Sequence, residues 1–352
     1  MIQLAHLQIG EHRRPFIIAE MSGNHNQSLD RALALVDAAA NAGADAIKLQ
    51  TFTADTMTLD SSRAEFTIQN KSSLWQGQTL HKLYQEAQTP WEWHAPIMQR
   101  AQAKGLVCFS SPFDLTAVDF LESLNVPAYK IASFECIDLP LIKKVAQTGK
   151  PIIISTGMAT LAEIDEAVRT ARENGCRDLV LLKCTSTYPA TPEDTHIRTI
   201  AHMRDLFGCP VGLSDHTMGL GTAIAATALG AVVIEKHFTL RRSDGGVDSA
   251  FSMEPEELEQ LVVETERAWL SMGVIHYGPT HAEAHGRTRR RSLYIAKDMK
   301  KGDRLSTENV RAIRPGLGLP PKHMDTVIGM TLTCDAAKGT PLSWDLLKSN
   351  PN

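Results

Sequence analysis

Two short apolar stretches of the sequence lead into histidines. "AVVIEKHFTL" closes a β-branched run with three ionisable side chains, among them Glu235 and His237, and "VGLSDH" ends at His216. Neighbouring imidazoles suit a divalent metal ion with open coordination positions. Carboxylates beside them can orient water or transfer protons. These residue types predict a metal site held by His216 and His237, with Glu235 close to it.

Polar side chains also end the other β-rich runs. Their tips carry Glu20, Lys48 and Gln50, Ser110 and Ser111, Lys130 and Ser133, Ser155 and Thr156, Lys183, Ser186 and Tyr188, and Asp215. Lys48 and Lys130, with several hydroxyls, suit a small doubly anionic ligand such as a phosphorylated carboxylic acid. One such residue alone is more often structural than functional. We expect a site because all the tips carry polar groups, and crowding charges without a ligand costs free energy.

The elements that must position these residues follow a regular order. The apolar runs span 16–21, 46–52, 107–112, 128–133, 151–156, 179–186, 211–216 and 232–238. Segments of helical period lie between them. Examples are 28–43, with Ser28 as N-cap, and 160–175, where Thr160 and Glu163 form a capping box. This alternation predicts a (β/α)8 TIM barrel, whose strand ends meet at one mouth. An open doubly wound sheet is the alternative, but no Gly-rich dinucleotide turn follows any strand.

Composition sets the broad class. The 352 residues, 43% hydrophobic and 22% charged, are enough for one large domain and a smaller one. A net charge of -4 gives no reason to expect nucleic acid or an acidic membrane as partner. Six scattered cysteines without a C-x-x-C pair, and no apparent signal or membrane segment, indicate a cytoplasmic protein. The long interruption at 53–79 is more typical of a functional loop than of an idle one.

Motifs in every part of the barrel resemble the sialic acid synthase family, whose members condense phosphoenolpyruvate with an N-acetylated amino sugar. The matching stretches are "IIAEMSGNHNQ", "GADAIKLQTF", "FSSPFD", "YKIASFE", "ISTGMAT", "KCTSTYPA", "GLSDHTMG" and "IEKHFTL". The stretch "RRSLYIAKDMKKGDRLSTENVRAIRPGLGLPP" is similar to the small antifreeze-like (SAF) domain that closes these synthases. The resemblance implies a catalytic barrel over 1–273, a linker over 274–289 and a SAF domain over 290–352.

The resemblance also implies roles for single residues. Phosphoenolpyruvate would be held by Lys48, Lys130, Ser111, Ser133 and Ser155, and Mn²⁺ (or Mg²⁺ or Co²⁺) by His216 and His237. Glu20 and Glu235 would place water and sugar hydroxyls, and Gln50, Tyr188 and Asp248 would position substrates. Ser186 stands where relatives carry Asn in the sugar site. Arg314 would reach the sugar pocket of the other subunit in a domain-swapped homodimer.

Three details within the family favour the pseudaminic acid synthases, which use 2,4-diacetamido-2,4,6-trideoxy-β-L-altropyranose. They are "SGNHNQ", "DSAFSMEPEEL" and the extended "TFTADTMTLD" loop. Legionaminic or N-acetylneuraminic acid synthases are the alternative with the same chemistry. Other classes are a Schiff-base aldolase using Lys130 or Lys183, a sugar-binding or ice-binding protein without catalysis, and a barrel metallohydrolase. A barrel metallohydrolase typically has His-x-His on its first strand, and this sequence has no such pair there.

Overall fold

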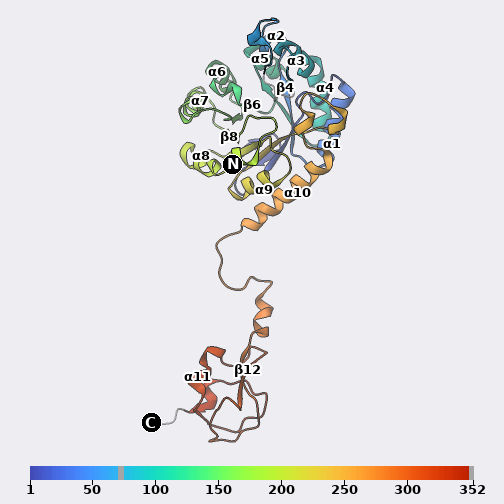
Figure 1. Ribbon diagram of the computed structural model, residues 1–352. Coiled ribbons are helices and arrows are strands. Elements are labelled where there is room, and N and C mark those ends of the chain that lie inside the picture. The colour runs from blue at the N-terminus through green and yellow to red at the C-terminus, as the bar shows by residue number, and fades with distance from the viewer. Residues whose placement is uncertain (70–74, 349–352) are drawn as a thin grey trace. The chain divides into compact units, whose positions relative to one another are not determined.

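The computed structural model describes residues 1–69 and 75–348, and within them eight parallel strands close into a barrel (Figure 1). The strands follow one another around the barrel in chain order, and the last pairs with the first. They are β3 (Phe16–Glu20), β4 (Ala46–Thr51), β5 (Val107–Pro112), β6 (Tyr129–Ile131), β7 (Ile152–Ser155), β8 (Leu179–Cys184), β9 (Val211–Asp215) and β10 (Val233–His237). The predicted TIM barrel is confirmed.

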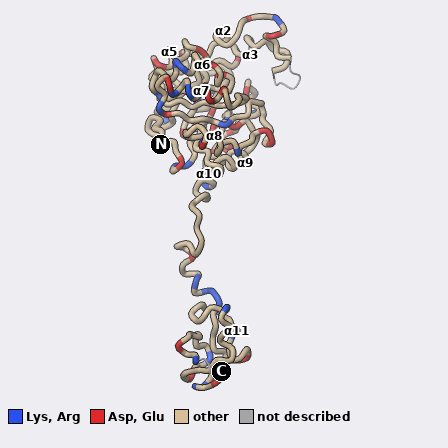
Figure 2. Tube along the Cα trace, turned by 90° about the vertical axis from the view of Figure 1, so that its left-hand side faces the viewer, with Lys and Arg blue, Asp and Glu red and all other residues tan. Residues whose placement is uncertain are grey.

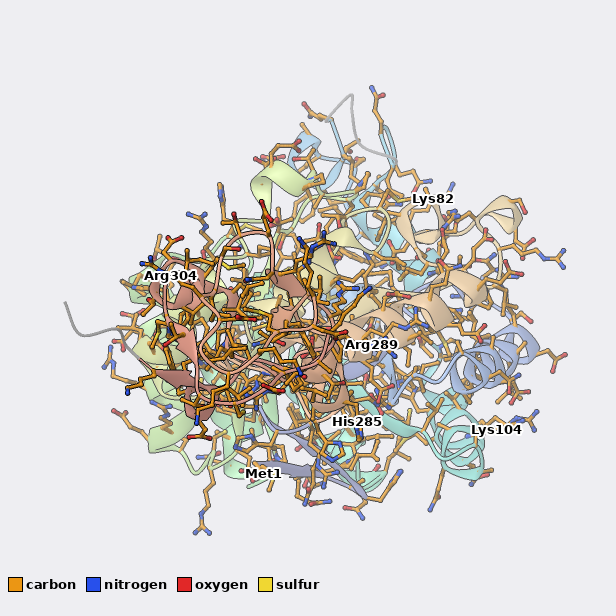
Figure 3. All side chains as sticks on the ribbon, turned by 90° about the horizontal axis from the view of Figure 1, so that it is seen from below. Met1, Lys82, Lys104, His285, Arg289 and Arg304 are labelled. Carbon is orange, nitrogen blue, oxygen red and sulfur yellow. The ribbon has the colours of Figure 1, made fainter. Side chains whose placement is uncertain are left out.

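Helices surround the barrel (Figure 1). They are α1 (Leu29–Asn41), α4 (Trp91–Ala103), α5 (Leu115–Ser123), α6 (Leu139–Gln147), α7 (Leu161–Glu173), α8 (Thr199–Phe207), α9 (Gly221–Ala228) and α10 (Pro255–Met272), with the short α2 (Ala54–Met57) and α3 (Leu80–Ala87) inserted after β4. Two predicted starts are confirmed: Ser28 caps α1, and Thr160 and Glu163 form the capping box of α7. Charged side chains such as Lys82 and Lys104 point outward from the helices (Figure 3).

Alternate residues of each strand belong to two different apolar layers. Phe16 and Ile18 of β3 join Leu182 of β8 in the cluster that fills the barrel. Ile17 and Ala19, the residues between, join the cluster that packs against the helices. Because side chains alternate along a strand, this parity decides which polar residues at the strand ends face the barrel interior.

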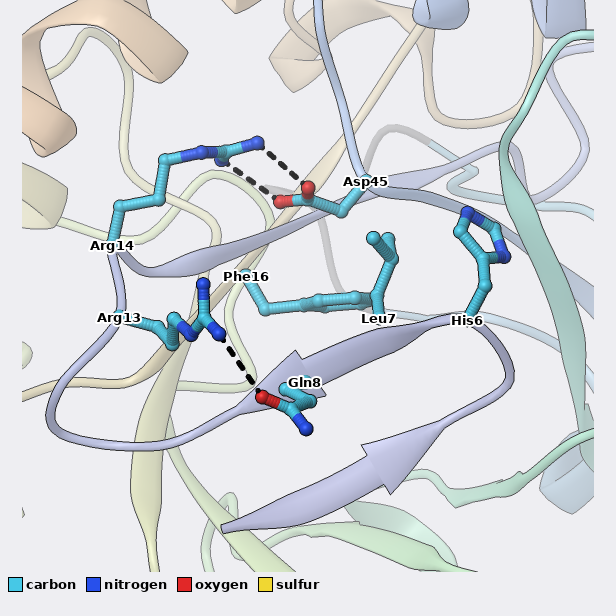
Figure 4. A pocket seen from close by; sticks show the side chains of 7 residues that line it. All are labelled: His6, Leu7, Gln8, Arg13, Arg14, Phe16 and Asp45. Carbon is cyan, nitrogen blue, oxygen red and sulfur yellow. Dashed lines mark hydrogen bonds and ion pairs between the residues drawn. The ribbon is translucent and has the colours of Figure 1, made fainter.

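The amino-terminal end of the barrel is covered by a hairpin of β1 (Ile2–Leu4) and β2 (Leu7–Ile9), whose apolar residues belong to the interior cluster. Beside it lies a cavity of about 360 Å³ (Figure 4). There Arg14 bonds Asp45 through two nitrogens at 3.0 and 2.7 Å. The polar strand ends described below lie at the opposite, carboxyl end of the barrel.

The chain divides into two compact units, Met1–Gly273 and Val274–Asn352. The second contains β11 (Ser292–Ile295), β12 (Val310–Ile313), α11 (Met324–Val327), β13 (Thr331–Leu332) and β14 (Leu347–Lys348), around its own apolar cluster. Residues 274–291 are exposed throughout, and the arginines of the run 287–291 that ends this stretch are blue in Figure 2. In the part of the chain that the structure describes, no helix is long and apolar enough to span a membrane.

Candidate active site

Four charged side chains meet inside the carboxyl end of the barrel. Lys48 Nζ lies 2.5 Å from Glu20 Oε2 and 3.7 Å from Glu235 Oε1. Lys130 Nζ lies 3.9 Å from the same Glu235 oxygen. All four residues are at most 5% exposed. The inward parity of β3, β4, β6 and β10 brings together residues that are up to 215 positions apart, as predicted from their places at the strand ends.

Hydroxyl and amide groups complete this charged cluster. Lys48 Nζ donates to Ser111 Oγ at 3.3 Å, and Lys130 Nζ donates to Ser155 Oγ at 2.6 Å. Gln50 Nε2 donates to Glu20 Oε1 at 2.9 Å. Each predicted phosphate-binding lysine therefore has a predicted hydroxyl beside it, and the two ammonium groups flank one carboxylate.

The two glutamates differ in proton affinity. Burial raises the pKa of Glu20 to about 7, against the opposing charge of Lys48. Glu235 is equally buried, but Lys130 and Lys48 outweigh the effect of burial and hold its pKa below the usual value. A pair of carboxyl groups whose pKa values are pushed apart can divide acid–base and electrostatic roles between them. Glu20 is the group able to hold or release a proton near neutral pH.

The two histidines lie side by side at the ends of the adjacent strands β9 and β10. The ring centroids of His216 and His237 are 5.3 Å apart. His216 Nδ1 is 2.9 Å from the carbonyl of Thr185, which fixes that ring and leaves its other nitrogen available. His237 Nδ1 lies 3.6 Å from Asp248 Oδ2 and has no hydrogen-bond partner among the described residues. Asp248 also contacts Ser22 Oγ.

These two imidazoles fit a divalent metal ion. Burial, and then the charges of His216 and Lys48, hold the pKa of His237 well below its usual value, so its ring is neutral, the form that binds metal. No group of three or more His, Cys, Asp or Glu residues suited to a metal occurs within residues 1–69 and 75–348. An ion held by His216 and His237 would therefore leave positions open for water and substrate.

Aromatic side chains line one side of the histidine pair. The Tyr188 ring is 4.6 Å from the His216 ring, and Phe251 is 5.0 Å from His237. Trp75 is 6.4 Å from Tyr188 and donates its Nε1–H to the carbonyl of Val247 at 3.0 Å. Trp75 belongs to the 53–79 segment, of which residues 70–74 lie outside the described residues. Through Trp75, the described end of this segment thus lines one side of the site.

Three hydroxyl or thiol groups lie together beside Lys130. Ser133 Oγ donates to Cys184 Sγ at 3.2 Å, and Ser186 Oγ is 3.8 Å from the same sulfur. Gly157, with φ of +44°, packs against both serines. A Cβ there would come within 2.5 Å of Ser133 Cβ and 2.7 Å of Ser186 Oγ, so only glycine fits.

The expectation that all polar strand ends face the mouth is wrong for several residues. Ser110, Lys183 and Asp215 have the outward parity of their strands. Ser110 bonds Thr51 at 2.6 Å, and Asp215 bonds Lys236 at 2.9 Å. Lys183 and Thr156 donate to main-chain carbonyls instead. Arg314, predicted for the sugar pocket of another subunit, is exposed and follows β12 in the second unit, and its role stays a prediction.

The site also contains residues that the sequence did not point to. Ser214 Oγ donates to Glu235 Oε1 at 3.3 Å, and Cys184 bonds Ser133. Both occupy inward positions two residues from a residue already identified as inward, so strict alternation would have found them. Glu135, within a matched motif, has a carboxylate oxygen without a hydrogen-bond partner among the described residues, and burial raises its pKa to about 7.

Comparison with known proteins decides the family. The NeuB family model matches residues 35–277, and the SAF domain model matches residues 290–348. The chain belongs to the NeuB family. It is 43% identical to pseudaminic acid synthase of Campylobacter jejuni, covering 96% of this chain and 98% of that protein. It is 37% identical to N,N'-diacetyllegionaminic acid synthase of Legionella pneumophila, with 95% of both covered.

A solved structure supports the same assignment. N-acetylneuraminic acid synthetase of Leptospira borgpetersenii, crystallised with citrate, superposes with a TM-score of 0.72 at 32% identity, covering 81% of this chain and 94% of that one. This NeuB-family protein is thus a transferase, a phosphoenolpyruvate-condensing nonulosonic acid synthase. Family membership confirms the predicted enzyme class and SAF domain, and sets aside the non-catalytic and metallohydrolase alternatives. NeuB enzymes are generally metal-dependent, and an amino sugar is the implied second substrate.

The histidine pair gives a first prediction. His237→Ala should remove most Mn²⁺ binding and most metal-dependent turnover, because a single remaining imidazole holds the ion weakly. Titration of the metal-stripped protein, followed by electron paramagnetic resonance of free Mn²⁺, measures this, and circular dichroism checks the fold. Wild-type affinity and full turnover in the variant would contradict the assignment.

Proposed function

We propose that this NeuB-family enzyme is a pseudaminic acid synthase. It condenses phosphoenolpyruvate with 2,4-diacetamido-2,4,6-trideoxy-β-L-altropyranose and water, and releases pseudaminic acid and phosphate. The observation that carries the proposed chemistry is the buried cluster of Lys48, Lys130, Glu20 and Glu235, which lies near the adjacent imidazoles of His216 and His237. Synthesis of legionaminic acid or N-acetylneuraminic acid is the alternative with the same chemistry.

The charged cluster suits phosphoenolpyruvate. Lys48 and Lys130 can accept its phosphate and carboxylate, with Ser111 and Ser155 as neutral donors beside the ammonium groups. Ser133, three residues after Lys130 in the chain, adds a further hydroxyl. Glu235 remains ionised between the lysines, so the empty site is already nearly neutral. A ligand anion would then replace the glutamate carboxylates as partner of the lysine ammonium groups, instead of neutralising an excess of positive charge.

Bond changes follow from the two substrates. C3 of the enol phosphate attacks the aldehyde carbon of the open-chain sugar, and positive charge develops at C2. Water adds at C2 and loses one proton, and the new alkoxide takes up one proton. As the C2–O bond to phosphate breaks, the C2 hydroxyl gives its remaining proton to the departing phosphate, which leaves a keto group at C2. We assign the water proton to Glu20, whose carboxyl titrates near neutral pH. The protonated carboxyl can then return that proton to the alkoxide.

His216 and His237 would hold Mn²⁺ or a similar ion. When bound, such an ion supplies Lewis-acid polarisation of the sugar aldehyde. The chain's own residues do the rest: Asp248 lies 3.6 Å from His237 and can orient that ring, while Tyr188 bounds the space beside both imidazoles. Gln50, bonded to Glu20, is placed to position substrate oxygens near the proton carrier.

The identity of the sugar rests on sequence similarity. Identity is higher to the pseudaminic acid synthase than to the legionaminic acid synthase, at similar coverage. The stretch "SGNHNQ" places Ser22 against Asp248, and Asn26 bonds the carbonyl of Gly245 at 3.0 Å. One of the sequence details that favour this sugar, Ser22, is therefore linked through Asp248 to His237.

A panel of sugars tests the substrate. Phosphate release from phosphoenolpyruvate should be fastest with the altro-configured diacetamido sugar, on the order of 100-fold above its manno-configured counterpart and N-acetylmannosamine, because buried polar groups reject a mismatched hydroxyl or amide. A coupled phosphate assay compares kcat/KM values. Preference for either other sugar would overturn the substrate while retaining the chemistry.

The pH dependence tests Glu20. Since the proposed step needs an ionised Glu20, kcat/KM for phosphoenolpyruvate should fall as pH decreases below about 7. Glu20→Gln should lower turnover by roughly 10²- to 10⁴-fold and lose that limb of the profile. Ionisation of phosphoenolpyruvate itself affects both proteins, so the ratio of the two profiles isolates Glu20. An identical acid limb in the variant would assign the titration to another group.

The SAF domain can complete the site of another subunit. We propose a domain-swapped homodimer in which Arg314 reaches the sugar pocket of the partner. The exposed residues 274–290 support this proposal, because a long polar segment permits a domain to extend to a second subunit. The exposure of Arg314 is consistent with a contact outside its own unit.

Mixed dimers provide the test. Arg314→Ala and His237→Ala should each be inactive, whereas purified mixed dimers of the two variants should regain about half of wild-type activity, since a swapped mixed dimer has one intact site of two. Activity of differently tagged, co-purified dimers gives the measurement. Absence of recovery in mixed dimers, or full activity as a monomer, would refute the exchange.

A further inference from the structure

A buried ion pair lies on the opposite side of the strands from the charged cluster. Lys236 stands between Glu235 and His237 in β10, so its side chain leaves the barrel on the helix side. Asp215 is its register partner in β9, directly before His216. Both residues are 2% exposed, so neither can interact appreciably with water or substrate.

The ammonium group of Lys236 has three close acceptors. Its Nζ lies 2.9 Å from Asp215 Oδ2, 2.6 Å from the carbonyl of Thr217 and 3.2 Å from the carbonyl of Gly219. The other carboxylate oxygen of Asp215 accepts from Thr217 N at 2.9 Å. An ammonium group has three protons, so the geometry satisfies all of them. The contacts tie the end of β10 to the loop after β9.

These contacts surround the two histidines. Asp215 and Thr217, on either side of His216, are both held by Lys236, and Lys236 itself precedes His237. The main chain of His216 is also anchored, because its carbonyl accepts from Ala190 N at 3.0 Å. Side-chain contacts hold the His237 ring less closely, since its Nδ1 lies 3.6 Å from Asp248 Oδ2 and has no hydrogen-bond partner among the described residues. The main chain must therefore set much of its placement.

A buried ion pair is seldom the most stabilising choice for such a position. Desolvation of the two charges offsets their attraction, and apolar residues of similar volume are often equally stable. An ion pair with fixed acceptors instead defines one geometry. We propose that Lys236 and Asp215 are positioning residues, which set the separation of His216 and His237 from the outer face of the barrel. This inference rests on the proposed metal site.

Metal binding by the stripped full-length protein tests the inference. Lys236→Met and Asp215→Asn should weaken Mn²⁺ binding about 10- to 100-fold, as loss of groups that orient metal ligands does. Lys236→Arg, which can donate to the same oxygens, should restore most of the affinity. The KM for phosphoenolpyruvate should stay near that of the wild type, because Lys48 and Lys130 are untouched.

Asp45→Asn is the matched control. It removes an ion pair of the same barrel, with Arg14 at 2.7 Å, at the end away from the histidines. It should leave Mn²⁺ affinity unchanged. If Lys236→Met does not fold, Asp215→Asn, which keeps the side-chain shape, decides the question.

The possible failures are distinguishable. If His237→Ala binds Mn²⁺ like the wild type, the proposed metal site is wrong and the inference falls with it. If His237→Ala loses the ion but Lys236→Met and Asp215→Asn bind it normally, the positioning role alone is overturned. Equal weakening in Asp45→Asn would show general destabilisation, and would also overturn that role.

Discussion

Burial of four charged side chains in one end of the barrel is the constraint on which the site depends. Lys48 lies between Glu20 and Glu235, and Lys130 approaches Glu235 from another strand. Each ion alone would be costly to remove from water, and together they come close to neutrality. These ion pairs are shielded from water, and an anionic substrate can replace them with its own contacts to the lysines. In this way a rigid barrel can bind and orient phosphoenolpyruvate.

The barrel makes this possible because its strands have two different faces. Apolar residues such as Ile18 and Leu182 fill the interior beneath the charged cluster, and the hairpin β1–β2 covers the other end. The outer face carries the apolar layer against the helices, interrupted by the Lys236–Asp215 pair. Glu235 and His237, to which we assign the chemistry, face the barrel interior, and Lys236, to which we assign the positioning role, stands between them in β10 and faces outward.

Much of this organisation could be predicted from sequence. Apolar runs that alternate with segments of helical period predict the barrel. The position of the lysines, glutamates and histidines at the ends of these runs predicts that they meet at the carboxyl end of the barrel. Orientation was harder at Ser110, Lys183 and Asp215, because a polar residue at a strand end can lie on either face and only the register decides. The different pKa values of Glu20 and Glu235 depend on three-dimensional distances to Lys48 and Lys130, for which a linear sequence carries no direct signal.

The central claim is that phosphoenolpyruvate binds against Lys48 and Lys130, next to a carboxyl group that titrates near neutral pH. Calorimetric titration with phosphoenolpyruvate at about pH 8, in buffers of different ionisation enthalpy, measures the protons taken up on binding. An anion placed beside Glu20 should raise its pKa moderately, so we predict uptake of about a few tenths of a proton in the wild type, where most Glu20 stays ionised and able to accept the water proton, and almost none in Glu20→Gln. Binding without proton uptake, or equal uptake in both proteins, would contradict the account.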